Sequence, residues 1–77
     1  MIDLNEIMLN KPCLVKQLKK EPSILRRFLD VGIIPGAKIE KILVSPFGGI
    51  CAYSVMGTTI AIRDQDAKGI KVSYEEI

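Results

Sequence analysis

Apolar and polar residues alternate in short blocks along this chain, a pattern typical of a sheet built from short strands. The blocks predict five strands: residues 12–19, 36–45, 50–56, 58–63 and 70–72. The alternation is imperfect in the first strand, which indicates either a bulge or two partly covered faces, and in the second strand, which indicates a bulge. Bulges bend strands sharply, and a sheet bent in this way can close into a small barrel that leaves no edge exposed.

The second predicted strand shows most clearly why a bulge is expected. Its apolar residues Ile39, Ile42 and Val44 do not share one parity along the strand. All three can face inward only if the strand bulges near Lys41. The two strands that follow are typical of a hairpin around Gly57.

One stretch, residues 22–31, has the spacing of a helix instead. Five apolar residues share one face of it, which we expect to turn toward the core: Ile24, Leu25, Phe28, Leu29 and Val31. Gly32 stands where a helix C-terminus favours a left-handed residue. Pro35-Gly36 fits the centre of a type II turn. These two backbone signals place the end of the helix and the start of the next strand.

Two single turns are predicted near the ends of the chain. Asp3 begins a capping-box pattern, so we expect one turn that packs Leu4 and Ile7 against the sheet. Asp64 is the expected N-cap of the second turn. Residues 74–77 are expected to form a loose tail.

The length of 77 residues suits one domain with a small stability margin. Hydrophobic residues make up 48% of the chain and aromatic residues only 5%, so the core should be aliphatic. Because that hydrophobic share is high for so small a domain, we expect part of it to stay exposed as a contact surface.

The net charge of +2 is too small for non-specific nucleic-acid binding to be the default. The basic residues are uneven, however, because five of them face only Glu21 within one window: Lys16, Lys19, Lys20, Arg26 and Arg27. They form either a solvated face or a contact for an acidic partner or an anionic lipid surface.

The chain lacks the residues of a catalytic or metal-binding constellation. Histidine is absent, which removes the commonest general base and transition-metal ligand. Cys13 and Cys51 lack CxxC spacing and are expected to be reduced core residues rather than ligands. Asp64 and Asp66 alone do not make a cation cage. There is no signal peptide or apolar run of about 20 residues. We therefore expect an intracellular protein that is not an enzyme and holds no metal or cofactor.

Four segments resemble, in the same order, the motifs of the ferrous iron transport protein A (FeoA) family. Residues 27–39 are similar to its RL-x-x-LG-hydrophobic-x-PG-x-x-I segment, and residues 45–49 to its P-x-GG loop. Residues 57–63 resemble G-x-x-I-A-L-R, and residues 67–72 resemble A-x-x-I-x-V. The resemblance extends over residues 4–72. It departs from the family pattern at Asn10-Lys11, where a glycine is common.

This resemblance implies a mainly β, SH3-like barrel of about five strands with one inserted α-helix, formed by residues 1–77 as a single domain. It also implies a small cytoplasmic accessory protein of ferrous iron uptake. Such a protein would act by contact with a FeoB-type membrane transporter, which carries a GTPase domain. That partner would recruit it to the inner face of the cytoplasmic membrane. Nucleic acid is not an expected partner, whereas weak self-association is allowed.

The same module also occurs as the C-terminal domain of iron-dependent repressors. The alternative function is therefore a metal-responsive regulatory or nucleic-acid-binding module. No DNA-binding helix-turn-helix precedes the predicted barrel, so we do not expect a complete repressor.

Because the chain offers no reactive group, the expected site is a contact surface. Phe47 lies at a glycine-rich tip, where its ring is hard to bury. Tyr53 and Met56 come from the hairpin, and they either border one apolar groove together with Phe47 or belong to the core. The predicted contact residues are Arg27, Ile34, Pro35, Phe47, Tyr53 and Met56.

Overall fold

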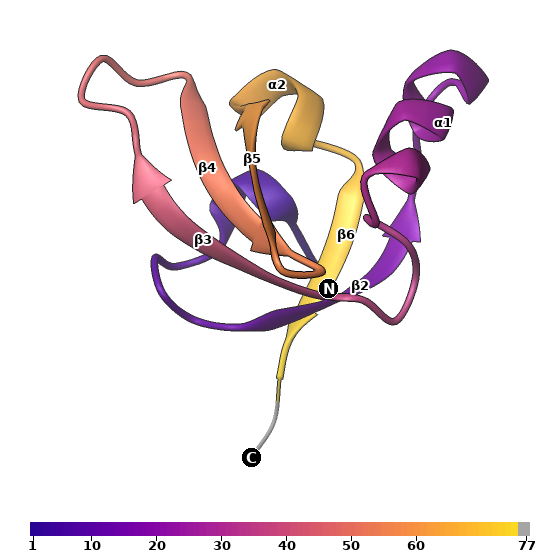
Figure 1. The fold of residues 1–77 in the computed structure, drawn as a ribbon, viewed down its shortest axis with the longest axis horizontal. Coiled ribbons are helices and arrows are strands. Elements are labelled where there is room, and N and C mark those ends of the chain that lie inside the picture. The colour runs from indigo at the N-terminus through magenta and orange to yellow at the C-terminus, as the bar shows by residue number, and fades with distance from the viewer. Residues whose placement is uncertain (76–77) are drawn as a thin grey trace.

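The computed structural model describes residues 1–75, which form a curled antiparallel sheet with two short α-helices (Figure 1). The elements are β1 (Ile2–Asp3), the 3-10 turn η1 (Leu4–Glu6), β2 (Cys13–Leu18), α1 (Pro22–Asp30), β3 (Lys38–Val44), β4 (Ile50–Val55), β5 (Thr58–Arg63), α2 (Asp64–Ala67) and β6 (Ile70–Tyr74). The predicted mainly β class with one inserted helix is confirmed. The structure adds the two-residue strand β1, which is too short to leave an alternation in the sequence.

The six described strands lie in the order β1-β6-β2-β3-β4-β5, so β1 and β5 are the two edges of the sheet. Each edge strand runs directly into a helical turn: β1 into η1 and β5 into α2. These two turns contact each other. The space between the edges is therefore spanned by side chains of η1 and α2, and not by a strand ladder.

Both predicted bulges are present. The register between β2 and β6 shifts between Val15 and Gln17, and the register between β3 and β4 shifts between Lys41 and Leu43. The inward residues of β3 differ from the prediction, because Ile39 and Lys41 are buried while Val44 is exposed. Lys41 can occupy an inner position since its ammonium donates a hydrogen bond to the backbone carbonyl oxygen of Asn5 at 2.9 Å. Val44 lies at the end of the hairpin, beyond the core.

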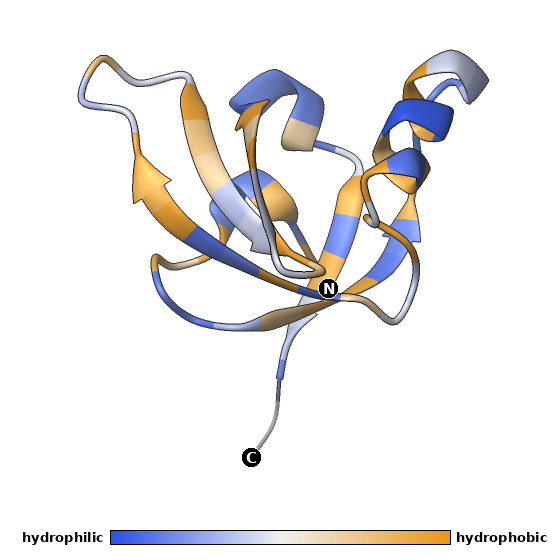
Figure 2. Ribbon diagram, viewed as in Figure 1, coloured by the Kyte–Doolittle hydropathy of each residue, from blue (hydrophilic) through white to orange (hydrophobic). Residues whose placement is uncertain are grey.

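The core is aliphatic, as predicted, with one aromatic ring at its centre. Its buried members are Leu4, Ile7, Cys13, Val15, Ile33, Ala37, Ile39, Cys51, Tyr53, Val55, Ile62, Ala67, Ile70 and Val72. Figure 2 shows the corresponding apolar segments along the inner strands. The predicted turn that packs Leu4 and Ile7 against the sheet is confirmed, and both thiols lie in the core.

The two predicted side-chain caps are wrong. Asp3 does precede η1, but its carboxylate pairs with the Lys71 ammonium at 2.6 Å and accepts a hydrogen bond from the Gly69 N–H at 3.3 Å. Asp64 is the first residue of α2 and not its N-cap, and its carboxylate accepts a weak hydrogen bond from the Cys51 thiol at 3.6 Å. Partners from distant elements compete successfully with the local backbone for both carboxylates.

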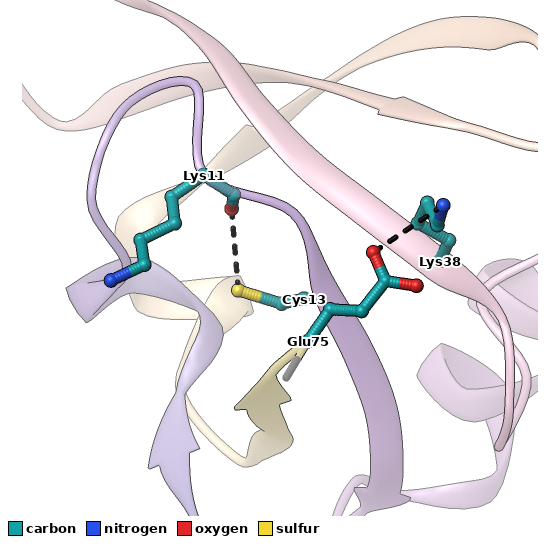
Figure 3. A network of polar contacts seen from close by, with 4 residues as sticks. All are labelled: Lys11, Cys13, Lys38 and Glu75. Atoms are coloured by element: carbon teal, nitrogen blue, oxygen red, sulfur yellow. Dashed lines mark hydrogen bonds and ion pairs between the residues drawn. The ribbon is translucent and has the colours of Figure 1, made fainter. Parts of the chain in front are cut away.

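Glu75, the residue that follows β6, contacts residues near the start of β2 and of β3. The ammonium of Lys38 lies 3.4 Å from a carboxylate oxygen of Glu75, and the Cys13 thiol donates to the Lys11 carbonyl oxygen at 3.5 Å (Figure 3). The Glu75 N–H donates to the Pro12 carbonyl oxygen at 3.1 Å. The predicted loose tail is thus wrong for residues 74 and 75, and its residues 76 and 77 lie outside the described residues.

Within residues 1–75, neither helix has the length and apolar character that crossing a membrane requires.

Candidate partner-binding groove

Helix α1 lies beside the sheet and has no fully buried residue. Ile24, Leu25 and Phe28 are half-buried, whereas Leu29 is 40% exposed and Val31 is 41% exposed. The prediction that the whole apolar face of this helix turns toward the core is therefore wrong for Leu29 and Val31. Only the half-buried part of this apolar face packs against the rest of the protein, so its remaining surface lacks a partner among the described residues.

The end of α1 is fixed by hydrogen bonds of the backbone. The Ile33 N–H donates to the Phe28 carbonyl oxygen at 3.0 Å, and the Gly32 N–H donates to the Leu29 carbonyl oxygen at 3.1 Å. This is the Schellman arrangement, and it places Gly32 at a φ of 98°. Ile33 is fully buried and anchors the helix end in the core. The predicted left-handed glycine at this position is confirmed.

The predicted turn after the helix is also present. The Ala37 N–H donates to the Ile34 carbonyl oxygen at 3.0 Å across Pro35-Gly36, and Gly36 has a φ of 93°. Ile34 and Pro35 are both exposed on this turn. The turn leads directly into β3, so the helix end and the strand start are rigidly related.

Strand β5 presents a free backbone edge. It pairs with β4 through a two-residue turn, Met56-Gly57, in which both residues have positive φ. The strand residues that flank such a turn form a hydrogen-bonded pair, and the pairs then alternate along the ladder. The N–H and C=O groups of Thr59 and Ala61 consequently point away from β4. No backbone partner meets them among the hydrogen bonds of residues 1–75.

Two adjoining hollows, of about 300 and 340 Å³, lie between α1 and this edge. They share Arg27, Phe28, Ala61 and Ile62. Consecutive residues 60–63 of β5 line them, so residues from both faces of the strand contribute. The hollows therefore follow the edge of the strand and do not lie on one face of it. We call this feature the α1–β5 groove; its other lining residues are Ile24, Val31, Ile50, Ile60, Arg63 and Asp66.

The groove has an apolar floor and a basic rim. Arg27 and Arg63 line it from opposite sides, with Asp66 as the acidic residue among the lining side chains. The ion pairs formed within residues 1–75 are Lys38 with Glu75 and Lys71 with Asp3, so neither guanidinium is paired there. Two exposed guanidinium groups against one carboxylate favour an occupant that carries negative charge.

The structure separates the predicted contact residues into four places. Arg27 lines the groove. Met56 lies against Gly32 at the end of α1, and Gly32 is followed in the sequence by Ile34 and Pro35. Met56 is 69% exposed. Of the two interpretations left open for Met56, the surface position therefore holds.

Tyr53 and Phe47 lie elsewhere. Tyr53 has no exposed surface, so its assignment as a surface contact is corrected to the core. Burial of the ring raises the pKa of its hydroxyl far above the ordinary value. Phe47 is 96% exposed in the loop between β3 and β4, which lies on the opposite side of the molecule from α1 in Figure 1. No single groove can contain both Phe47 and Arg27.

The sequence prediction missed most of the groove. Phe28 was assigned to the core, and Ala61 and Arg63 were not among the predicted contact residues. The alternation of apolar and polar residues in β5 was visible in the sequence, but its position at the edge of the sheet depends on the order of the strands. No local pattern reports that order.

The described residues offer no place for a chelated metal ion. Residues 1–75 contain no group of three or more Cys, Asp or Glu side chains close enough to share one. Burial raises the pKa of both the Cys13 and the Cys51 thiols, which keeps them protonated and unreactive at neutral pH. The groove, and not a reactive centre, is therefore the main candidate site.

Comparison with known proteins identifies the family. The FeoA domain family matches residues 2–74. The chain belongs to the FeoA family. A search of curated protein sequences gives no significant match.

Solved FeoA structures have the same fold. The FeoA protein from Chlorobium tepidum is 27% identical, with a TM-score of 0.89 over 95% of this chain and 70% of that chain. FeoA from Stenotrophomonas maltophilia, solved in complex with zinc, is 26% identical, with a TM-score of 0.78 over 97% of this chain and 96% of that one. That FeoA is described as a procaryotic SH3 domain protein, and the SH3-like fold expected for this chain is thereby confirmed.

A manganese-dependent transcriptional repressor shares the fold alone. It is 19% identical, with a TM-score of 0.84, and the match covers 95% of this chain but 41% of the repressor. The FeoA fold thus occurs as part of a longer regulator.

Proposed function

We propose that this FeoA-family chain is an accessory protein of ferrous iron uptake that acts by binding a FeoB-type membrane transporter. Membership of the FeoA family carries the link to iron transport. The Stenotrophomonas maltophilia FeoA is itself described in terms of activating ferrous iron transport. In this proposal, residues 1–77 act as one cytoplasmic domain, and the transporter recruits it to the inner face of the membrane.

The α1–β5 groove is the surface that best supports contact with a partner. It combines exposed apolar side chains of α1 with two exposed guanidinium groups, an arrangement typical of binding sites with an apolar centre and a charged rim. In this proposal the exposed tip at Phe47 is a second contact surface, and Met56, Ile34 and Pro35 form a third one beside the end of α1.

The proposal is tested by binding to the purified cytosolic GTPase domain of a FeoB-type transporter from the same genome. We expect the parent chain to bind and the Arg27→Glu variant to bind about tenfold more weakly, since a rim charge is reversed. Arg26→Glu is the matched control, because Arg26 is exposed on the same helix but does not line the groove. Phe47→Ala tests the second surface separately.

Deletion of the gene provides an independent readout. Ferrous iron uptake should fall when the chain is missing and recover when it is supplied again. Absence of binding by the parent chain, together with normal uptake in the deletion strain, would contradict the proposal.

A metal-responsive or nucleic-acid-binding module is the second candidate function. The basic residues near α1 favour it, because Lys16, Lys19, Arg26 and Arg27 are all exposed. A salt-dependent shift of duplex DNA or of RNA by the purified chain would support it. No shift at low salt would remove it.

A further inference from the structure

We propose that the free edge of β5 binds an extended acidic and apolar segment of the partner protein, which pairs with Ala61 as an additional strand inside the α1–β5 groove. This inference rests on the proposed function for the identity of the partner. It goes beyond that function by naming the mode of binding and the chemistry of the bound segment.

The backbone of β5 supplies the first part of the argument. Ala61 directs its N–H and C=O away from β4, and residues 1–75 provide no backbone partner for them. An exposed strand edge is a template for another strand, and peptide recognition by strand addition uses this geometry. Ala61 has the smallest side chain on the outer side of this edge, so a strand can approach it closely.

The helix supplies the second part. α1 lies across the groove from Ala61, with Phe28 half-buried and Val31 exposed along the same side. A strand added to β5 would turn every second side chain toward this apolar margin. The groove therefore favours a segment in which every second residue, the one that faces α1, is apolar.

Charge determines which residues suit the positions between the apolar residues of the bound segment. Arg27 and Arg63 line the same hollow and form no ion pair within the part of the chain that the structure describes, whereas Asp66 is its acidic residue. A carboxylate on the bound segment can accept hydrogen bonds from a guanidinium in bidentate geometry. The preferred occupant is thus an extended segment in which apolar and acidic residues alternate. A basic segment would be repelled.

The decisive experiment removes one edge donor without changing the β4–β5 ladder. In Ala61→Pro the lost N–H is the one that points into the groove, and proline is tolerated at the solvent side of an edge strand. Thr59→Pro is the matched control, because Thr59 loses an equivalent edge N–H but does not line the groove. We expect Ala61→Pro to weaken binding of the transporter's cytosolic domain at least about tenfold, and Thr59→Pro to change it less than about twofold.

Equal binding by folded Ala61→Pro and the parent chain would overturn strand addition, as would equal losses in both proline variants. If Ala61→Pro does not fold, amide hydrogen exchange of the parent chain decides the question. The Ala61 amide should exchange fast in the free protein and become protected in the complex, whereas the Thr59 amide should stay fast. An Ala61 amide that remains fast in the complex would overturn the proposal.

Failure of the proposed function gives a different result. If the transporter domain does not bind the parent chain, the groove is tested with a blocked Val-Glu-Val-Glu-Val-Glu peptide. Protection of the Ala61 amide by this peptide, and not by its Val-Lys counterpart, would support strand addition with another partner. Lack of protection by the alternating acidic peptide would then overturn the inference as well.

Discussion

The ammonium of Lys41 is buried beneath η1, where it donates to the Asn5 carbonyl oxygen at 2.9 Å and lies 6.0 Å from the centre of the Tyr53 ring. This contact joins the bulge of β3 to the turn that follows β1. It reinforces the backbone bridge between Lys41 and Leu9, which joins the same two parts of the chain.

Replacing Lys41 by methionine should lower the free energy of unfolding by about 1–3 kcal/mol, because the Asn5 carbonyl loses a charged donor. Urea denaturation measures the change. Lys38→Met is the control, since the Lys38–Glu75 pair is solvent-exposed and contributes at most about 1 kcal/mol. Equal losses of the free energy of unfolding in the two variants would show that the buried Lys41 contact stabilises the fold no more than the exposed ion pair does.

Tyr53→Phe should leave the free energy of unfolding unchanged or raise it. The Tyr53 hydroxyl is buried and has no hydrogen-bond partner among residues 1–75, so its removal relieves a desolvation cost while the ring stays in place. Tyr53→Ala should instead cost about 3–5 kcal/mol, because it leaves a cavity at the centre of the core. A loss of more than about 1 kcal/mol in Tyr53→Phe would reveal a hydrogen bond to that hydroxyl.

Gly32→Ala should destabilise the chain more than Gly36→Ala. Both glycines have positive φ, so each alanine carries a conformational cost of about 1–2 kcal/mol. Only at Gly32 would the new methyl group lie 2.7 Å from the Met56 Cγ, whereas Gly36 faces open space. Thermal melting of both variants measures the difference. Adding Met56→Ala to Gly32→Ala should recover part of it.

Acid should weaken the contact between β1 and β6 through Asp3. The hydrogen bond from Lys71 lowers the pKa of the Asp3 carboxyl below its ordinary value of 3.8. A lowered pKa in the folded state stabilises the protein above the ordinary value, and this stability is lost as the pH falls through the folded pKa. The melting temperature of the Asp3→Asn variant should therefore fall less than that of the parent chain when the pH is lowered from about 6 to about 2. Identical pH profiles would exclude a role of this pair.

Phe47→Ala should leave the melting temperature nearly unchanged, since a side chain that is 96% exposed contributes little to folding. If the loop contacts a partner, the same variant should bind that partner more weakly. A large loss of stability would place the ring in a contact within the protein that the structure does not have.

Sequence reasoning predicted the backbone of this fold better than its surface. The Schellman end at Gly32, the turn at Pro35-Gly36 and both bulges follow from local backbone chemistry or from parity, and all are confirmed. The orientation of Leu29 and Val31 was wrong, because helix periodicity identifies an apolar face without showing how much of it the sheet covers. Asp3 and Asp64 failed as caps for a related reason: their partners come from elements distant in sequence.

The strand order has a consequence for how the polypeptide acquires its shape during synthesis. β6, the last of the strands described in residues 1–75, lies between β1 and β2, the first two. The N-terminal strands therefore remain without their central neighbour until residues 70–74 have left the ribosome. The sheet should therefore close only after β6 has emerged, and a nascent chain stopped before Ile70 should expose Leu4 and Val15 to chaperones.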